Sequence, residues 1–212
     1  MRFVRLNRCL THATAKPVVW LLCLLPLAAL VLRVFEQDLG PNPVETLLRS
    51  TGDWALRGLC VVLLLTPLQQ GVGLTGLGRM RRLLGLFSFF YAVLHASIYA
   101  WLEVGWLWQD MWQDVLQRPF ITVGMLAWLL LAALAATSYQ AAIRFLGGKR
   151  WKQLHRMVHA AAWLALLHFY WMREAKNNTQ EVLIYVAVIA VLQGWRVWRW
   201  HQRRRQQRVI RP

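Results

Sequence analysis

The chain has 212 residues, of which 58% are hydrophobic and 13 are Trp, and its mean hydropathy is positive. This composition excludes an ordinary soluble domain of the same size and indicates an integral membrane protein. The formal net charge of +16 is also typical of nucleic-acid-binding proteins, so the positions of the charges must decide between the two classes.

Apolar runs long enough to cross about 30 Å of hydrocarbon predict an all-α, six-helix transmembrane bundle. The first run continues into Arg33 and Phe35 without a small-residue cleavage site, so we expect a retained helix. The second is short and holds Arg57, which must reach the interface or another helix. The six expected spans lie near 17–35, 54–70, 83–102, 119–138, 155–172 and 182–200.

Between the third and fourth spans, the stretch "EVGWLWQDMWQDVLQ" at 103–117 mixes Trp and Leu with Gln and acidic residues. This mixture favours a segment that lies at the membrane surface and does not cross it. No internal repeat or low-complexity linker is apparent elsewhere in the chain.

The charges are strongly asymmetric along the predicted topology. If the N-terminus is cytoplasmic, 19 of the 25 Lys and Arg fall inside, and all nine Asp and Glu fall on or at the edge of the other side. The positive-inside rule therefore predicts cytoplasmic termini. We expect a basic cytoplasmic N-terminus at 1–16, a transmembrane domain at 17–200 and a basic cytoplasmic tail at 201–212. Anionic lipid headgroups explain the tail better than nucleic acid does.

Two histidines lie at matched depth in parallel spans. His95 is about 18 Å from the cytoplasmic start of the third span, and His168 is about 17 Å from the start of the fifth. Two imidazoles at one level can ligate a haem iron from opposite faces. The sequence therefore predicts haem b between the third and fifth spans, with His95 and His168 as axial ligands.

His155 lies about 20 Å nearer the cytoplasm than His168, so it cannot ligate the same iron. A second haem at that depth would need a partner where Arg81 and Arg82 stand. A structural role, a contact to a haem propionate and ligation of a second haem all remain open for His155. His159 lies one turn further along the same helix.

The three cysteines, Cys9, Cys23 and Cys60, form no C-x-x-C pair. This spacing excludes a zinc knuckle, an iron–sulfur motif and the covalent attachment of haem. Any haem must therefore be held by ligation and packing alone.

Short motifs spread along the chain resemble the MsrQ (YedZ) family of ferric-reductase-like transmembrane domains. The resemblance covers about residues 10 to 200. It is carried by "GPNPVE" at 40–45, "TG" at 51–52, "TPL" at 66–68, "RRLLGLFSFFYAVLH" at 81–95, "RPFITVG" at 118–124, "ATS" at 136–138 and "WKQLHR" at 151–156.

The resemblance implies a haem-binding subunit of the bacterial inner membrane. Such a subunit takes electrons from the quinone pool and passes them to MsrP, a periplasmic molybdopterin enzyme that reduces methionine sulfoxide in oxidised proteins. It also implies b-type haem and FMN, with His95, His155 and His168 at the positions of the family's histidines. Trp163 stands where some relatives have a further histidine, which argues against a second haem.

The flavin has no evident phosphate cradle in the sequence. The glycine-rich stretch "GVGLTGLG" at 71–78 has no strand before it, so it is not a dinucleotide fingerprint. Arg81 and Arg82 follow it and are candidates to contact a flavin phosphate, a haem propionate or a quinone headgroup. Gly85 and Gly124 would leave room for a ring or for close helix packing.

Two other functions remain open. The chain could be a self-contained ferric or quinone reductase of the cytochrome b type, or a proton-coupled transporter with histidine relays, although its spans are poor in acids. It has no thiol pair or outward metal cluster, so we expect an electron conduit and not the catalytic subunit. The expected docking rim for the partner comprises 36–53, 103–118 and 173–181, including Glu103, Asp110 and Asp114.

Overall fold

The computed structural model describes residues 2–174 and 179–210, and within them the chain is helical without strands. The helices α1 to α4 are Arg2–Thr11, Ala15–Phe35, Pro43–Gly71 and Arg81–Ile98, with a short 3-10 helix η1 at Thr75–Arg79. A π-helical turn η2 at Tyr99–Glu103 continues α4. The helices α5 to α9 are Trp108–Gln117, Pro119–Ala136, Gln140–His155, Val158–Glu174 and Gln180–Ile210.

Five helical segments in the described part of the chain are long and apolar enough to cross a membrane. They are Ala15–Phe35, Pro43–Gly71, Arg81–Glu103, Pro119–Ala136 and Gln180–Gln206. The remaining predicted span, 155–172, corresponds to α8, which has 17 residues. A helix of that length is about 26 Å long, slightly less than a typical hydrocarbon core, so the count of six spans stays a prediction.

The second span is much longer than its apolar run. Hydropathy placed it at 54–70, whereas α3 has 29 residues and begins at Pro43. The Asn42 side chain accepts a hydrogen bond from the Glu45 amide at 3.1 Å, and proline at the first helical position needs no amide partner. Hydropathy detects only the membrane-embedded part of a helix, so it does not predict the polar first turns of α3. The connection between the fourth and fifth expected spans is likewise helical over Gln140–His155, as α7, with a kink at Gly147.

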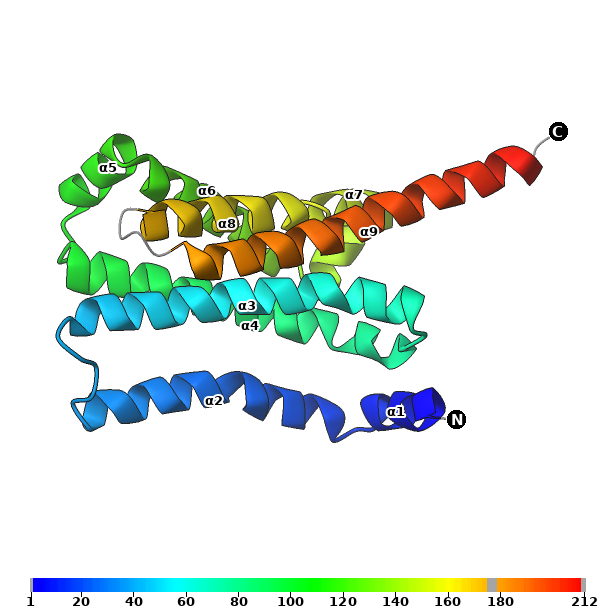
Figure 1. Cartoon of the computed structure of the whole chain (residues 1–212), viewed down its shortest axis with the longest axis horizontal. Coiled ribbons are helices and arrows are strands. Elements are labelled where there is room, and N and C mark those ends of the chain that lie inside the picture. The colour runs from blue at the N-terminus through cyan, green and yellow to red at the C-terminus, as the bar shows by residue number, and fades with distance from the viewer. Residues whose placement is uncertain (1, 175–178, 211–212) are drawn as a thin grey trace.

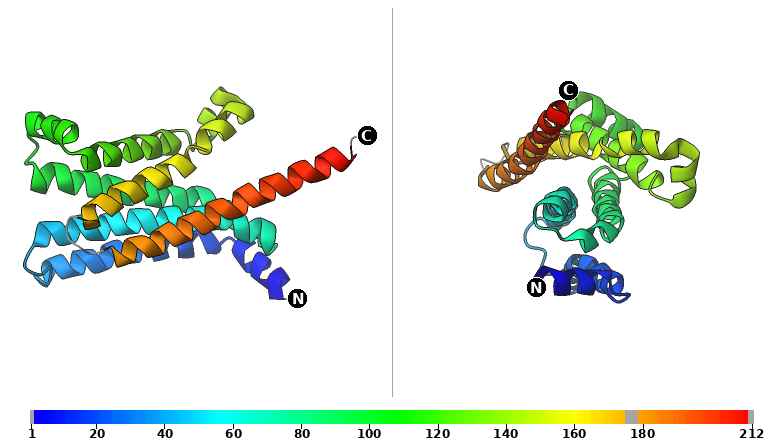
Figure 2. Two further views of the ribbon diagram at one scale, coloured as in Figure 1. Left: turned by 45° about the horizontal axis from the view of Figure 1, so that its top comes forward. Right: turned by 90° about the vertical axis from the view of Figure 1, so that its right-hand side faces the viewer.

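The bundle consists mainly of two closely packed helix pairs, α3 with α4 and α6 with α8. Their facing sides form the apolar core, which includes Leu59, Leu63, Ala161 and Leu166. α9 packs against α8 and α3, and its C-terminal part projects beyond the bundle (Figures 1 and 2).

α2 lies along the outside of the bundle, with Leu30 as its buried residue (Figure 1). The Tyr91 hydroxyl of α4 donates to the Cys23 carbonyl at 2.8 Å and accepts from the Leu27 amide at 3.2 Å. In a regular helix the Leu27 amide would donate to the Cys23 carbonyl. The Tyr91 hydroxyl is therefore inserted between the two partners of one backbone hydrogen bond of α2. Tyr91 thereby fastens α2 to the core.

Charge separates the two ends of the bundle. The end that we call the acidic end, formed by 36–53, 103–118, 173–174 and 179–181, holds all nine Asp and Glu of the chain; residues 175–178 of the predicted docking rim lie outside the described residues. The opposite end, the basic end, comprises α1, residues 72–82, α7 and the part of α9 from Arg196 onward; Figure 1 shows the two ends on its left and right sides. The separation is the one that the positive-inside rule requires, and the direction of insertion remains a prediction.

Candidate functional site

The structure places His95 of α4 beside His168 of α8. Their ring centres are 6.1 Å apart and the ring planes are inclined by 80°. Both helices run from the basic end toward the acidic end, and the short distance between the rings shows that the two histidines lie at one level. The two side chains that the sequence singled out therefore share one site.

Each imidazole is held by a backbone carbonyl on a neighbouring helix. His95 Nδ1 is 2.9 Å from the carbonyl oxygen of Leu48, and His168 Nδ1 is 2.7 Å from that of Phe120. A carbonyl can only accept, so Nδ1 must carry the proton in both rings. The lone pair of each ring is therefore on Nε2, the nitrogen available to a metal.

A glycine lies against each ring, four residues after the residue whose carbonyl accepts. A Cβ added to Gly52 would lie 3.1 Å from His95 Nδ1, and one added to Gly124 would lie 2.8 Å from His168 Nδ1. Gly124 thus gives room to an imidazole at a close helix approach. At Gly85, by contrast, an added Cβ would meet nothing within 4 Å, so no close packing occurs there.

A cavity of about 420 Å³ contains the two histidines. This volume is within the range of small-molecule and cofactor pockets, about 300–1,000 Å³. The walls are mostly apolar and come from α3, α4, α6 and α8. They include Leu56, Leu59, Ala92, Ala127, Trp128, Leu131 and Phe169.

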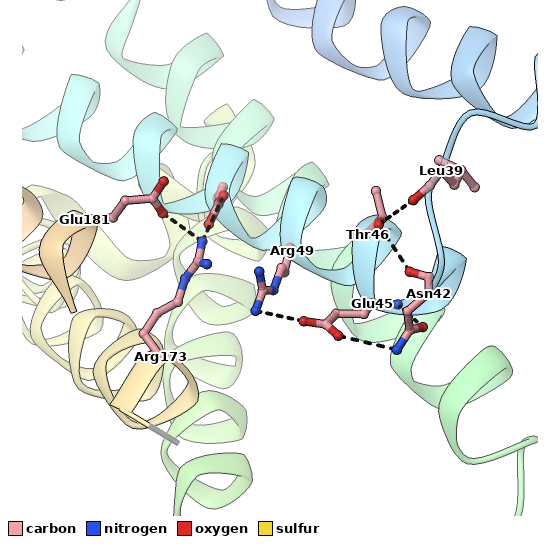
Figure 3. A network of polar contacts seen from close by, with 8 residues as sticks. Leu39, Asn42, Glu45, Thr46, Arg49, Arg173 and Glu181 are labelled. Carbon is pink, nitrogen blue, oxygen red and sulfur yellow. Dashed lines mark hydrogen bonds and ion pairs between the residues drawn. The ribbon is translucent and has the colours of Figure 1, made fainter. Parts of the chain in front are cut away.

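Three arginines also line this cavity, and all three belong to the acidic end. Arg49 pairs with Glu45 at 2.7 Å, and Arg118 pairs with Asp114 at 3.3 Å. Arg173, with a side chain only 8% exposed, pairs with Glu181 at 2.8 Å and with Asp53 at 3.7 Å. Figure 3 shows Arg173 between α3 and the start of α9, with Arg49 nearby on α3.

The other predicted site residues do not line this cavity. His155 Nε2 is 3.2 Å from the Thr137 hydroxyl, and its ring stacks on Trp151 with centres 4.1 Å apart. Arg81 donates to Thr66 and Gln69 at the basic end, and Arg82 is exposed beside it. The structure thus separates His155, Arg81 and Arg82 from the pair of histidines.

Sequence reasoning missed the three arginines and the glycine of α3. The position of the arginines in the sequence could have identified them. Arg49, Arg118 and Arg173 are cations on the predicted periplasmic side, where the positive-inside rule expects few. Gly52 lies in the "TG" motif at 51–52, but its contact with His95 depends on how α3 and α4 face each other. No local pattern gives that information.

The described residues contain no group of three or more His, Cys, Asp or Glu side chains that could hold a metal ion. The two imidazoles alone supply two ligands. That arrangement suits a metal whose other ligands come from a macrocycle, as in haem. The donor set and the mostly apolar cavity walls therefore fit a haem better than a free ion.

Comparisons with known proteins identify the family of the chain. Residues 51–167 match the family described as ferric reductase like transmembrane component. A relative from Polaromonas naphthalenivorans (strain CJ2) is 50% identical over 198 residues, covering 93% of this chain and 90% of that protein. One from Bordetella pertussis is 49% identical, covering 89% and 91%, and one from Herminiimonas arsenicoxydans is 43% identical, covering 89% and 87%.

All three relatives are named protein-methionine-sulfoxide reductase heme-binding subunit MsrQ. No solved structure matches the chain. The identity extends over nearly the whole length of both partners and includes the helices that carry His95 and His168. The chain therefore belongs to the MsrQ family of ferric-reductase-like transmembrane proteins.

Proposed function

We propose that the chain binds one b-type haem between His95 and His168 and conducts electrons across the bacterial inner membrane to a periplasmic methionine sulfoxide reductase. The observation that carries this proposal is the facing pair of imidazoles, each with its Nδ1 bound to a carbonyl, inside a cavity of about 420 Å³. The names of the relatives support the haem and the methionine sulfoxide reductase system.

The spacing of the rings would allow His95 and His168 to hold one iron together. A bond from a metal to an imidazole nitrogen is about 2 Å long, and the centre of the ring lies about 1 Å beyond the nitrogen. Two ligands in line would therefore have ring centres about 6 Å apart, and the observed separation is 6.1 Å. Nε2 is the ligating atom that the two carbonyl contacts leave available.

The bound haem would supply reversible one-electron chemistry, and the residues of the chain would hold it and set its surroundings. The carbonyls of Leu48 and Phe120 orient the ligands and increase their basicity. The apolar walls exclude water, and Arg49, Arg118 and Arg173 offer positive charge to the propionate carboxylates.

The charge separation supports the orientation of the bundle, and the direction of electron flow is the one that the family resemblance implies. With the basic end in the cytoplasm, the cavity arginines and the acidic end face the periplasm. Electrons enter from the quinone pool, with FMN as a further carrier, and leave through the acidic end to an MsrP-like molybdopterin enzyme. The chain is then the electron-transfer subunit, and the partner reduces the methionine sulfoxide.

The visible difference spectrum of the purified protein, reduced minus oxidised, tests the haem site. We expect His95→Ala and His168→Ala each to abolish the low-spin b-type signal. His12→Ala and His201→Ala change exposed residues and should leave it intact. An unchanged spectrum in both ligand variants would contradict the assignment of His95 and His168 as haem ligands.

A self-contained ferric reductase is the second candidate, because the matching family is described as ferric reductase like. It would use the same haem but would reduce a ferric chelate directly. Mixing the reduced protein with either a ferric chelate or the partner reductase, and comparing the rates of haem oxidation, separates the two functions. Faster oxidation by the chelate would favour the second.

A further inference from the structure

A second cluster of polar side chains lies at the basic end, apart from the cavity. It joins four helices through Thr66 of α3, Arg81 of α4, His159 of α8 and Arg196 of α9. Arg196 donates to the Leu63 carbonyl and to His159 Nε2, both at 2.8 Å, and to the Thr66 hydroxyl at 3.1 Å. Arg81 donates to the same hydroxyl at 3.1 Å.

The two guanidinium groups are close together because they share one hydroxyl oxygen. Each donating nitrogen is 3.1 Å from Thr66 Oγ1, so the two nitrogens lie within about 6 Å of each other. Two positive charges at that distance repel each other, most strongly where solvent is partly excluded. An arrangement of this kind is stabilised when an anion lies between or beside the charges.

The partners of both arginines in the described part of the chain are neutral. Thr66, Gln69, Leu63 and His159 supply only hydroxyl, amide, carbonyl and imidazole groups. Every Asp and Glu of the chain lies at the acidic end. The three cavity arginines, in contrast, each pair with a carboxylate.

Two buried donor atoms of this cluster, Arg196 Nε and His159 Nδ1, lack a hydrogen-bond partner among the described residues. Arginine cannot accept, so His159 Nε2 must accept from Arg196, and Nδ1 must therefore carry the ring proton. A buried donor without an acceptor costs free energy, and a group with several acceptor oxygens would remove that cost.

We propose that Arg81, Arg196 and His159 form a binding site for a phosphate group at the basic end of the bundle. Phosphate combines negative charge with several acceptor oxygens, which suits two guanidinium groups and an imidazole N–H better than a single carboxylate does. Its source is either the headgroup of an anionic phospholipid or a soluble phosphate ester. The site stands independently of the haem between His95 and His168.

The surroundings are accessible from the membrane surface. Trp198 and Trp200 are 54% and 48% exposed on the next turns of α9, and tryptophan prefers the headgroup level of a bilayer. Arg199 and Arg203 donate to Gln70 at the end of α3 and add positive charge nearby. A phosphate at the membrane surface can therefore reach Arg81, which is exposed at the edge of the cluster.

Binding to the delipidated full chain in detergent tests the site, with native mass spectrometry as the readout. The probes are phosphatidylglycerol, with diacylglycerol as its phosphate-free control, and FMN, with riboflavin as its control. We expect at least one phosphate-bearing probe to bind, and Arg196→Gln and Arg81→Gln each to weaken it about tenfold or more. Arg144→Gln removes the same charge from an exposed position of α7 and should bind like the parent.

The results separate the sources. Binding of phosphatidylglycerol alone identifies a lipid site, and binding of FMN alone identifies a soluble phosphate ester. Equal weakening by Arg144→Gln, or equal binding of the phosphate-free controls, overturns the proposal. If Arg196→Gln does not fold, Arg81→Gln carries the test, because Arg81 lies exposed at the start of α4. The haem spectrum should stay unchanged in all variants, so a failure of this site is distinguishable from a failure of the haem site.

Discussion

Gly124 of α6 lies directly against the imidazole of His168, where an added Cβ would be 2.8 Å from Nδ1. That distance is too short for any real side chain, so either the helices must separate or the ring must turn. Both changes would displace Nε2 from its position opposite His95. The glycine is therefore a positioning residue for the proposed ligand.

We accordingly expect Gly124→Ala to lose most of the bound haem or to shift its midpoint potential. Gly52→Ala should have a smaller effect, because its Cβ would be 3.1 Å from His95 Nδ1 and a small ring movement relieves the contact. The measurements are the haem content per protein and a redox titration. Gly85→Ala is the matched control, since its Cβ would meet nothing within 4 Å. Equal haem content and potential in all three variants would refute the role of the two glycines.

Arg173 should contribute to stability as well as to the cavity. Its side chain is 8% exposed between Asp53 and Glu181, and removing a buried partner leaves a poorly solvated charge behind, at a cost of about 3 kcal/mol. We expect Arg173→Gln to lower the thermal midpoint clearly, and the double variant with Asp53→Asn to recover part of the loss. Arg33→Gln breaks an ion pair with Asp38 that is 45% and 76% exposed, so it should cost about 1 kcal/mol or less. Similar losses at Arg173 and Arg33 would contradict this account.

The proposed docking surface is testable through exposed acids of the acidic end. Glu103 and Asp110 are exposed, whereas Asp114 is half-buried, accepts from the Tyr99 hydroxyl at 2.7 Å and pairs with Arg118. Charge reversal at Asp110 should slow oxidation of the haem by the partner reductase in a salt-sensitive way and leave the spectrum intact. Glu103 lines the cavity, so its reversal should disturb the spectrum as well.

Reversal at Asp114 should also disturb the spectrum, because Arg118 lines the cavity. Arg144→Glu at the basic end is the control for a general charge effect. If the Asp110 variant is oxidised at the parental rate, docking through 103–118 is wrong. The segment 36–53 then becomes the next candidate.

The membrane orientation has a separate test in reporter fusions. A fusion after the C-terminus should place its reporter in the cytoplasm, because the basic end is expected there. A fusion truncated after Gln117, at the end of α5, should be active in the periplasm and serves as the matched control. The reverse result for both fusions would invert the bundle and place the haem cavity nearer the cytoplasm.

The sequence predicted the helical class, the approximate spans and the two facing histidines, because hydropathy and helical rise suffice for these. It could not predict that α3 begins at Pro43, since the polar first turns carry no membrane signal. It also could not predict that Arg173 meets Asp53, which lies 120 positions earlier in the chain. Contacts of that kind depend on the rotation and crossing of helices, and a single sequence leaves both undetermined.

The surroundings of His95 and His168 repeat one arrangement on two separate helix pairs. α3 supplies a carbonyl and a glycine to the histidine of α4, and α6 supplies the same two elements to the histidine of α8. Each pair packs far more extensively within itself than with the other pair. A group ligated by both histidines would therefore link the two helix pairs, and its binding free energy would add to the stability of the whole bundle.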